Sequence, residues 1–163
     1  MLTAEDVSSK TSRHHIENTL EALMKMGIIP IVNENDTVSI AELQESGEGF
    51  GDNDTLSAIV AELVNADVLV MVTDIDGLYN GDPRTDPDVK RIPYVETITP
   101  EIEALAGAPG SSRGTGGMAT KVRAAKFANE QGITCCVMSG ARPKDLYILF
   151  DGGQIGTVFQ GKR

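Results

Sequence analysis

The chain has 163 residues, a length that suits one domain, and 40% of them are hydrophobic, which is enough for a core. Its formal net charge of −10 argues against a nucleic-acid partner, because binding an extended phosphate backbone requires many Lys and Arg side chains. No apolar run is long enough to span a membrane, and no signal-peptide core is visible. The adjacent Cys135 and Cys136 fit neither a disulfide framework nor a zinc site, so we expect a cytoplasmic protein.

The first predicted elements are two helices and two strands. Residues 4–13 are polar and unpatterned, and a helix is expected from about Arg13 until Gly27, where apolar residues recur at helical spacing. Residues 28–32 form a short apolar run that we interpret as a buried strand. After a polar, glycine-rich loop, a second helix is expected at 54–65. The unbroken apolar run at 68–72 favours a strand of a parallel sheet that is covered on both faces.

The second half of the chain continues this alternation. Asp-Gly and Asp-Pro pairs within residues 75–98 predict turns and a hairpin. Thr99 and Pro100 predict the capped start of a short helix. A glycine-rich loop at 110–117 precedes a helix expected at 118–131. The last predicted elements are a strand at 133–138, a helix from Pro143 to Phe150 and a strand at 155–159.

This order predicts an α/β fold, an open and mostly parallel sheet sandwiched by helices. In such sheets ligands bind beyond the carboxyl ends of the strands. Two polar segments, Asn33 to Asp36 and Thr73-Asp74, directly follow predicted strands. We therefore expect both segments to face a ligand.

The segment Gly114 to Lys121, with the sequence GTGGMATK, predicts a phosphate cradle. Glycines let the backbone approach an anion, and the helix that follows supplies free N–H groups and the positive end of its dipole. Lys121 falls one turn into that helix and would point back to the same end. The segment matches neither a Walker loop nor a dinucleotide-binding fingerprint. Taken alone, it fits a flexible surface loop before an ordinary helix equally well.

Two clusters of carboxylates and amides, at 33–36 and 51–54, indicate a site for a small polar ligand. Carboxylates can hold an ammonium group, orient a lysine or approach a metal, and amides can hold a carboxylate. The cluster at 51–54, taken alone, could simply cap the helix that begins at Asp54.

Five segments in this order resemble the amino acid kinase family, and most nearly its members that phosphorylate glutamate. They are IVNEND at 31–36, GDND at 51–54, TDIDGLY at 73–79, DPR at 82–84 and GTGGMATK at 114–121. The resemblance covers essentially the whole chain and implies an amino acid kinase-like fold. Residues 1–163 would be the C-terminal portion of such a kinase domain, without the strands and lysine-bearing glycine loop that open it and without a PUA domain. The sheet would then carry an exposed apolar edge.

The resemblance implies ATP-dependent phosphorylation of the side-chain carboxylate of L-glutamate, the first step of proline synthesis, with Mg²⁺ accompanying ATP. Lys121 and Asp54 would be catalytic, Lys121 by neutralising charge on the transferred phosphoryl group and Asp54 by orienting lysines. Asp36, Asn53 and Asn33 would contact glutamate. The residues implied to contact the nucleotide are Thr73, Asp74, Thr115, Gly116, Gly117, Met118, Ala119, Thr120 and Lys121.

The resemblance also implies a homo-oligomer, either a dimer or a tetramer, and feedback inhibition by proline at or near the glutamate site. Two alternatives stay open. The chain could belong to a related carboxylate kinase that acts on aspartate or N-acetylglutamate. It could also be an inactive fragment or a module that binds a nucleotide or an amino acid without turnover.

Overall fold

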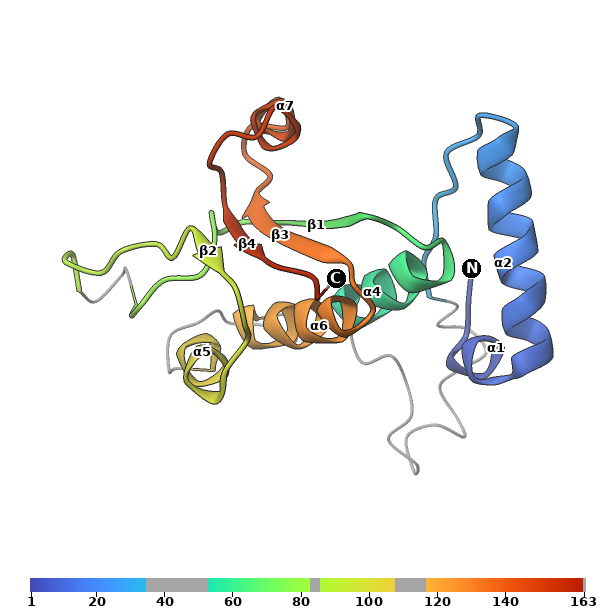
Figure 1. The fold of residues 1–163 in the computed structure, drawn as a ribbon, viewed down its shortest axis with the longest axis horizontal. Helices are drawn as coiled ribbons and strands as arrows, with labels where there is room; N and C mark the ends of the chain where they lie inside the picture. Colours follow the sequence, from blue (N-terminus) through green and yellow to red (C-terminus); the bar gives the residue numbers. More distant parts are fainter. Residues whose placement is uncertain (35–52, 83–85, 108–116, 163) are drawn as a thin grey trace.

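The computed structural model describes residues 1–34, 53–82, 86–107 and 117–162 (Figure 1). Within these ranges a four-stranded sheet has the order β1-β3-β4-β2. Its strands are β1 (Val68–Thr73), β2 (Tyr94–Val95), β3 (Thr134–Ser139) and β4 (Thr157–Phe159). The β1–β3 and β2–β4 pairs are parallel, and the β3–β4 pair is antiparallel. The sheet is mostly parallel, as predicted.

Helices flank this sheet and complete the predicted α/β architecture. They are α1 (Ala4–Ser8), α2 (Lys10–Lys25), α4 (Asn53–Leu63), α5 (Pro100–Ala106), α6 (Met118–Glu130) and α7 (Asp145–Phe150). Figure 1 shows α4, α5 and α6 along one side of the sheet and α7 on the other side. The fold class and the main elements from α4 to β4 are therefore confirmed.

The core lies between α6 and the strands. Small residues of α6, among them Ala125 and Ala128, are fully buried and let the helix approach the sheet closely. Opposite them lie Cys135 and Val137 of β3 and Phe159 of β4, each with no exposed surface. Each larger apolar side chain buried in this way contributes roughly 1.5–3 kcal/mol to stability. The packing fixes α6, and with it the first turn of α6, relative to the strand ends.

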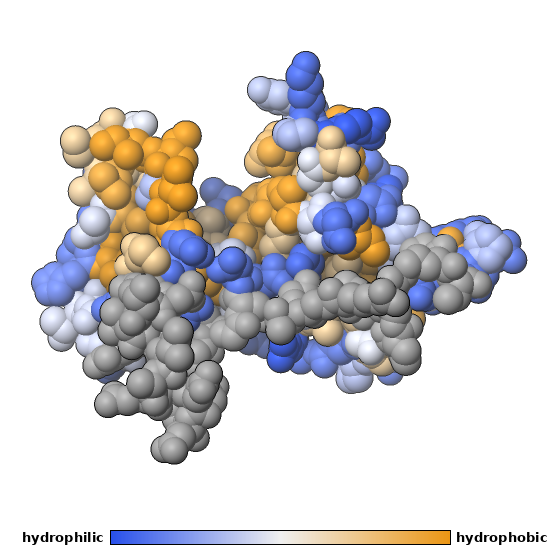
Figure 2. All heavy atoms as spheres, turned by 180° about the vertical axis from the view of Figure 1, so that it is seen from behind, coloured by the Kyte–Doolittle hydropathy of each residue, from blue (hydrophilic) through white to orange (hydrophobic). Residues whose placement is uncertain are grey.

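The prediction of a buried strand at 28–32 is wrong. The segment is not a strand, and the side chains of Ile29 and Ile31 are 88% and 96% exposed. A strand needs neighbours for its backbone groups, and in the described ranges the nearest pairing is a single parallel bridge between Leu2 and Glu34. Figure 2 shows apolar side chains gathered at the end of α2 and on the chain that follows it.

β1 is likewise not covered on both faces. Val72 is 56% exposed and Val68 39% exposed, although the strand itself forms where the apolar run predicts it. An apolar run shows that a strand can be buried, and the surrounding elements decide whether it is. The described elements cover one face of β1 more fully than the other.

Two helix starts differ from the prediction. Residues 4–8 and 10–13 are helical rather than unpatterned. Thr3 and Asp6 form a reciprocal capping box, and Ser9 caps α2 by accepting a hydrogen bond from the Ser12 N–H. Thr99 occupies the position before α5 and Pro100 the first helical position, as predicted. The Thr99 hydroxyl nevertheless makes no capping hydrogen bond with the helix backbone.

We expect Gly156→Ala to lower the free energy of unfolding by several kcal/mol more than Gly152→Ala. Both glycines have positive φ angles, +64° and +81°, so alanine costs roughly 1–2 kcal/mol at either position. At Gly156 an added Cβ would lie 2.2 Å from the carbonyl oxygen of Val137, whereas at Gly152 nothing lies within 4 Å. Urea unfolding measures the difference, and equal losses would contradict the expectation.

Candidate functional site

The topology brings two helix starts and two strand ends to one edge of the sheet. Because β1 and β3 are parallel and in register from Val68 opposite Thr134, their carboxyl ends lie together at Thr73 and Ser139. Helices α4 and α6 each lead into one of these strands through a short connection, so their first turns return to that same edge (Figure 1). Because α4 also packs along α6, Asp54 and Lys121 meet.

Lys121 and Asp54 form an ion pair that is nearly removed from solvent. The Lys121 Nζ lies 3.0 Å from Asp54 Oδ2, and the two side chains are only 10% and 16% exposed. The Thr120 hydroxyl donates a second hydrogen bond to the same carboxylate oxygen at 2.7 Å. Asp54 therefore holds the ammonium group of Lys121 in one place, in surroundings where charges interact more strongly than in water.

The start of α6 adds backbone donors beside this pair. Gly117 precedes the helix in an extended conformation and offers no side chain to cap it. The N–H groups of Thr120 and Lys121 bond back to the Gly117 carbonyl oxygen, whereas the earlier N–H groups of a helix have no acceptor inside it. A helix start next to a buried ammonium group suits an anion such as a phosphate. Thr115 and Gly116, also predicted to contact the nucleotide, lie outside the described residues.

Thr73 and Asp74 stand at the carboxyl end of β1, as expected. The Thr73 hydroxyl donates to Asp74 Oδ1 at 3.0 Å, and the Thr73 carbonyl oxygen accepts from the Gly140 N–H at 2.7 Å. Gly140 is packed so closely that an added Cβ would lie 2.7 Å from Val72 Cγ1. The Asp74 side chain stays exposed at the edge where a ligand of an open α/β sheet would bind.

The residues predicted to contact glutamate are only partly described. Asn53 is the first residue of α4, is exposed, and directly precedes Asp54. Asn33 is exposed, and its carbonyl oxygen accepts a hydrogen bond from the Leu2 N–H. Asp36 lies outside the described residues. The structure thus brings Asn53 to the Lys121–Asp54 pair, while Asn33 lies on the segment bridged to Leu2.

The described part of the chain has two buried thiols and no cluster of potential metal ligands. No group of three or more His, Cys, Asp or Glu side chains there could hold a metal ion. Burial raises the pKa of Cys135 to about 12, with a smaller contribution from Cys136, and raises the pKa of Cys136 to about 11. Both thiols therefore stay protonated and unreactive at neutral pH. No helix in the described ranges is long and apolar enough to cross a membrane.

Sequence reasoning missed one polar group beside this edge, the side chain of Arg91. It donates a hydrogen bond to the Gly156 carbonyl oxygen at 2.6 Å, and its residue bridges to Tyr79 across the predicted hairpin. The turn signals predict that hairpin, but nothing in the sequence pairs Arg91 with a residue 65 positions away.

A helix that begins after Gly117 and carries the buried Lys121, at the carboxyl edge of an open α/β sheet, has the features of a phosphate-binding site. The sequence profile of the amino acid kinase family matches residues 2–139. The chain belongs to the amino acid kinase family.

Similar proteins agree with this assignment. The chain is 49% identical over 163 residues to Glutamate 5-kinase of Clostridium perfringens and 48% identical to Glutamate 5-kinase of Listeria monocytogenes. These matches cover the whole chain but 60% and 59% of the relatives, so the chain spans about 60% of the length of the curated relatives it matches. Isopentenyl phosphate kinase of T. acidophilum, solved as a product complex, shares the fold: the TM-score is 0.53 at 19% identity, over 91% of this chain and 69% of that one.

We expect Asp54→Asn to lower the free energy of unfolding by roughly 3 kcal/mol, because it removes the carboxylate that lies 3.0 Å from a nearly buried ammonium group. The double variant Asp54→Asn/Lys121→Met should lose less than the sum of the two single losses, since it removes both charges. Urea unfolding of the four proteins gives the coupling energy.

A matched control is Glu103→Gln, which breaks the ion pair between Glu103 of α5 and Lys126 of α6. Both of those side chains are well exposed, at 39% and 48%, so the change should be much smaller. If the losses of unfolding free energy in the two single variants add up to the loss in the double variant, the two charges contribute to stability independently, and the expectation is contradicted.

Proposed function

We propose that this chain carries the nucleotide-handling part of a kinase that transfers the γ-phosphoryl group of ATP to the side-chain carboxylate of L-glutamate. The observation that carries the proposal is the Lys121–Asp54 pair at the start of α6. It supplies a fixed positive charge beside free backbone donors, as phosphoryl transfer requires. The glutamate acceptor is supported by the 49% and 48% identity to proteins named Glutamate 5-kinase.

The chemistry needs little from the protein beyond position and charge. The side-chain carboxylate of glutamate is ionised at neutral pH, with a pKa of about 4.3, so no general base is required. Catalysis then depends on aligning the carboxylate with the γ-phosphorus and on neutralising charge as it develops. Lys121 supplies that neutralisation. Asp54 acts through Lys121 by fixing the position of its ammonium group.

The remaining site residues divide between the two substrates. We assign Thr73, Asp74 and the first residues of α6 to the nucleotide, because they lie at the carboxyl edge of the sheet. We assign Asn53, beside Asp54, to glutamate, together with Asn33 and Asp36. Mg²⁺ would be coordinated mainly by the phosphates of ATP. Mg²⁺ is commonly held by one or two carboxylates plus substrate phosphates.

The proposal has four further parts. The first, a cytoplasmic location, rests on the cysteine pattern, and the other three rest on the family resemblance. Residues 1–163 form the C-terminal portion of the kinase domain. The protein assembles into a homo-oligomer. Proline inhibits it at or near the glutamate site. If saturating proline leaves the reaction rate unchanged, the proposal of inhibition by proline is wrong.

The decisive assay is ATP-dependent formation of an acyl phosphate, trapped with hydroxylamine, in separate reactions with glutamate, aspartate and N-acetylglutamate. We expect product with glutamate alone. Product with one of the other acceptors would assign a related carboxylate kinase. A folded chain that binds ATP without forming product would be a binding module instead.

We expect Lys121→Ala to lower kcat at least about 100-fold, as loss of a positioned charge does in comparable sites. Lys126→Ala is the matched control, because Lys126 lies on the same helix but is exposed and pairs with Glu103. Circular dichroism and thermal unfolding confirm that both variants are folded. Normal turnover in folded Lys121→Ala would overturn the role given to Lys121.

A further inference from the structure

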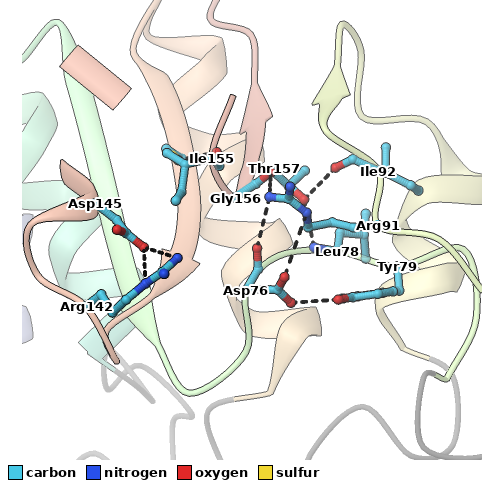
Figure 3. A network of polar contacts seen from close by, with 11 residues as sticks. Asp76, Leu78, Tyr79, Arg91, Ile92, Arg142, Asp145, Ile155, Gly156 and Thr157 are labelled. Carbon is cyan, nitrogen blue, oxygen red and sulfur yellow. Dashed lines mark hydrogen bonds and ion pairs between the residues drawn. The ribbon is translucent and has the colours of Figure 1, made fainter. Parts of the chain in front are cut away.

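One arginine, Arg91, contacts the loop that leaves β1. This exit loop, residues 74–78, follows directly on Thr73. Arg91 Nη1 donates to the carbonyl oxygen of Gly156 at 2.6 Å and lies 3.5 Å from that of Asp76. Its Nε lies 3.9 Å from Asp76 Oδ2. A single guanidinium group thus connects the exit loop with the turn that enters β4 (Figure 3).

A buried threonine makes a second connection at the same place. Thr157 has no exposed surface, and its hydroxyl accepts a hydrogen bond from the Leu78 N–H at 2.8 Å. The same hydroxyl donates to the carbonyl oxygen of Ile92 at 2.6 Å. The residue after Arg91 and the end of the exit loop are therefore held by one side chain of β4.

The loop also packs directly on the stem of Arg91. Gly77 has a φ of +145°, and an added Cβ would lie 2.6 Å from Thr157 Oγ1 and 3.0 Å from Arg91 Cδ. Glycine is required at this close approach. The position of the exit loop therefore depends on the Arg91 stem as well as on its charge.

The Asp76 carboxylate contacts this network, although its side chain is 53% exposed. The Tyr79 hydroxyl donates to Asp76 Oδ1 at 2.8 Å, and this hydrogen bond is the main reason that the pKa of Tyr79 is raised (Figure 3). Asp74, two residues earlier, is exposed and bonded to Thr73. The network thus holds one carboxylate of the loop and leaves the other at the edge of the sheet.

We propose that Arg91 is a positioning residue for the nucleotide: by fixing the exit loop it holds Thr73 and Asp74 in the arrangement that binds ATP. This inference rests on the proposed function. Arg91 itself touches neither Thr73 nor Asp74 in the described contacts, and acts through Asp76 and Gly77. It should therefore affect the binding of ATP and leave the binding of glutamate unchanged.

The test compares Arg91→Met, which keeps the apolar stem but removes the guanidinium group, with Arg91→Lys, which keeps a charge. Arg13→Met is the matched control. The Arg13 side chain is as buried as that of Arg91, 30% against 28% exposed, and it pairs with Glu62 at 2.7 Å. It lines the same pocket as Val68 and Thr134, which are the first residues of β1 and β3, at the end of these strands opposite to Thr73 and Ser139.

We expect Arg91→Met to raise the KM for ATP, and the Kd for ATP measured by calorimetry, about tenfold, which corresponds to roughly 1.4 kcal/mol. The KM for glutamate should change less than about twofold, a difference of roughly 0.4 kcal/mol. Arg91→Lys should recover part of the loss, and Arg13→Met should bind ATP as tightly as the unaltered protein. Hydrogen exchange at the Leu78 amide should accelerate in Arg91→Met, whereas the β3 amides should be unaffected.

The outcomes separate this inference from the proposed function. Unaltered protein that neither binds ATP nor forms acyl phosphate would overturn both. Unaltered protein that binds ATP, with Arg91→Met binding it equally tightly, would overturn the positioning role alone. Equal increases in the KM for ATP and for glutamate would show a general structural role and would also overturn it.

Discussion

The ion pair of Lys121 and Asp54 is the interaction on which the rest of the candidate site depends. Two charges that are mostly removed from water can persist only when they are paired. The pairing requires α4 and α6 to lie side by side with their first turns at one edge of the sheet. Small buried residues make that approach possible, Ala58 and Ala61 on α4 and Ala124 and Ala125 on α6. The apolar core therefore sets the position of a charge at its rim.

Much of this arrangement could be predicted from local sequence patterns. The helix at α6 and the strand at β3 are long, strongly patterned and bounded by glycine, so their positions were predicted to within one or two residues. The glycine-rich approach to Lys121 predicts a phosphate site, and this stays a prediction because the same segment taken alone fits a surface loop equally well. The partner of Lys121 was available only through the family resemblance, because 67 residues separate it from Asp54.

What could not be predicted depends on distant parts of the chain. The apolar run at 28–32 looked like a buried strand, but burial depends on what lies beside it, and Ile31 is almost fully exposed. Arg91 was missed for the same reason, since its partners Asp76 and Gly156 are brought to it by the sheet. The helix α1, by contrast, is not predicted above but could be predicted from local sequence, because Thr3 and Asp6 have the spacing of a capping box.

The adjacent cysteines of β3 have a practical consequence. Neighbouring residues of a strand point to opposite faces of the sheet, yet both Cys135 and Cys136 are buried, at 0% and 1% exposed. Each thiol is thus shielded by a different layer of the molecule. A thiol-modifying reagent would reach either sulfur only when the layer over it opens. The labelling rates of Cys135 and Cys136 would therefore measure how often each side of the sheet opens.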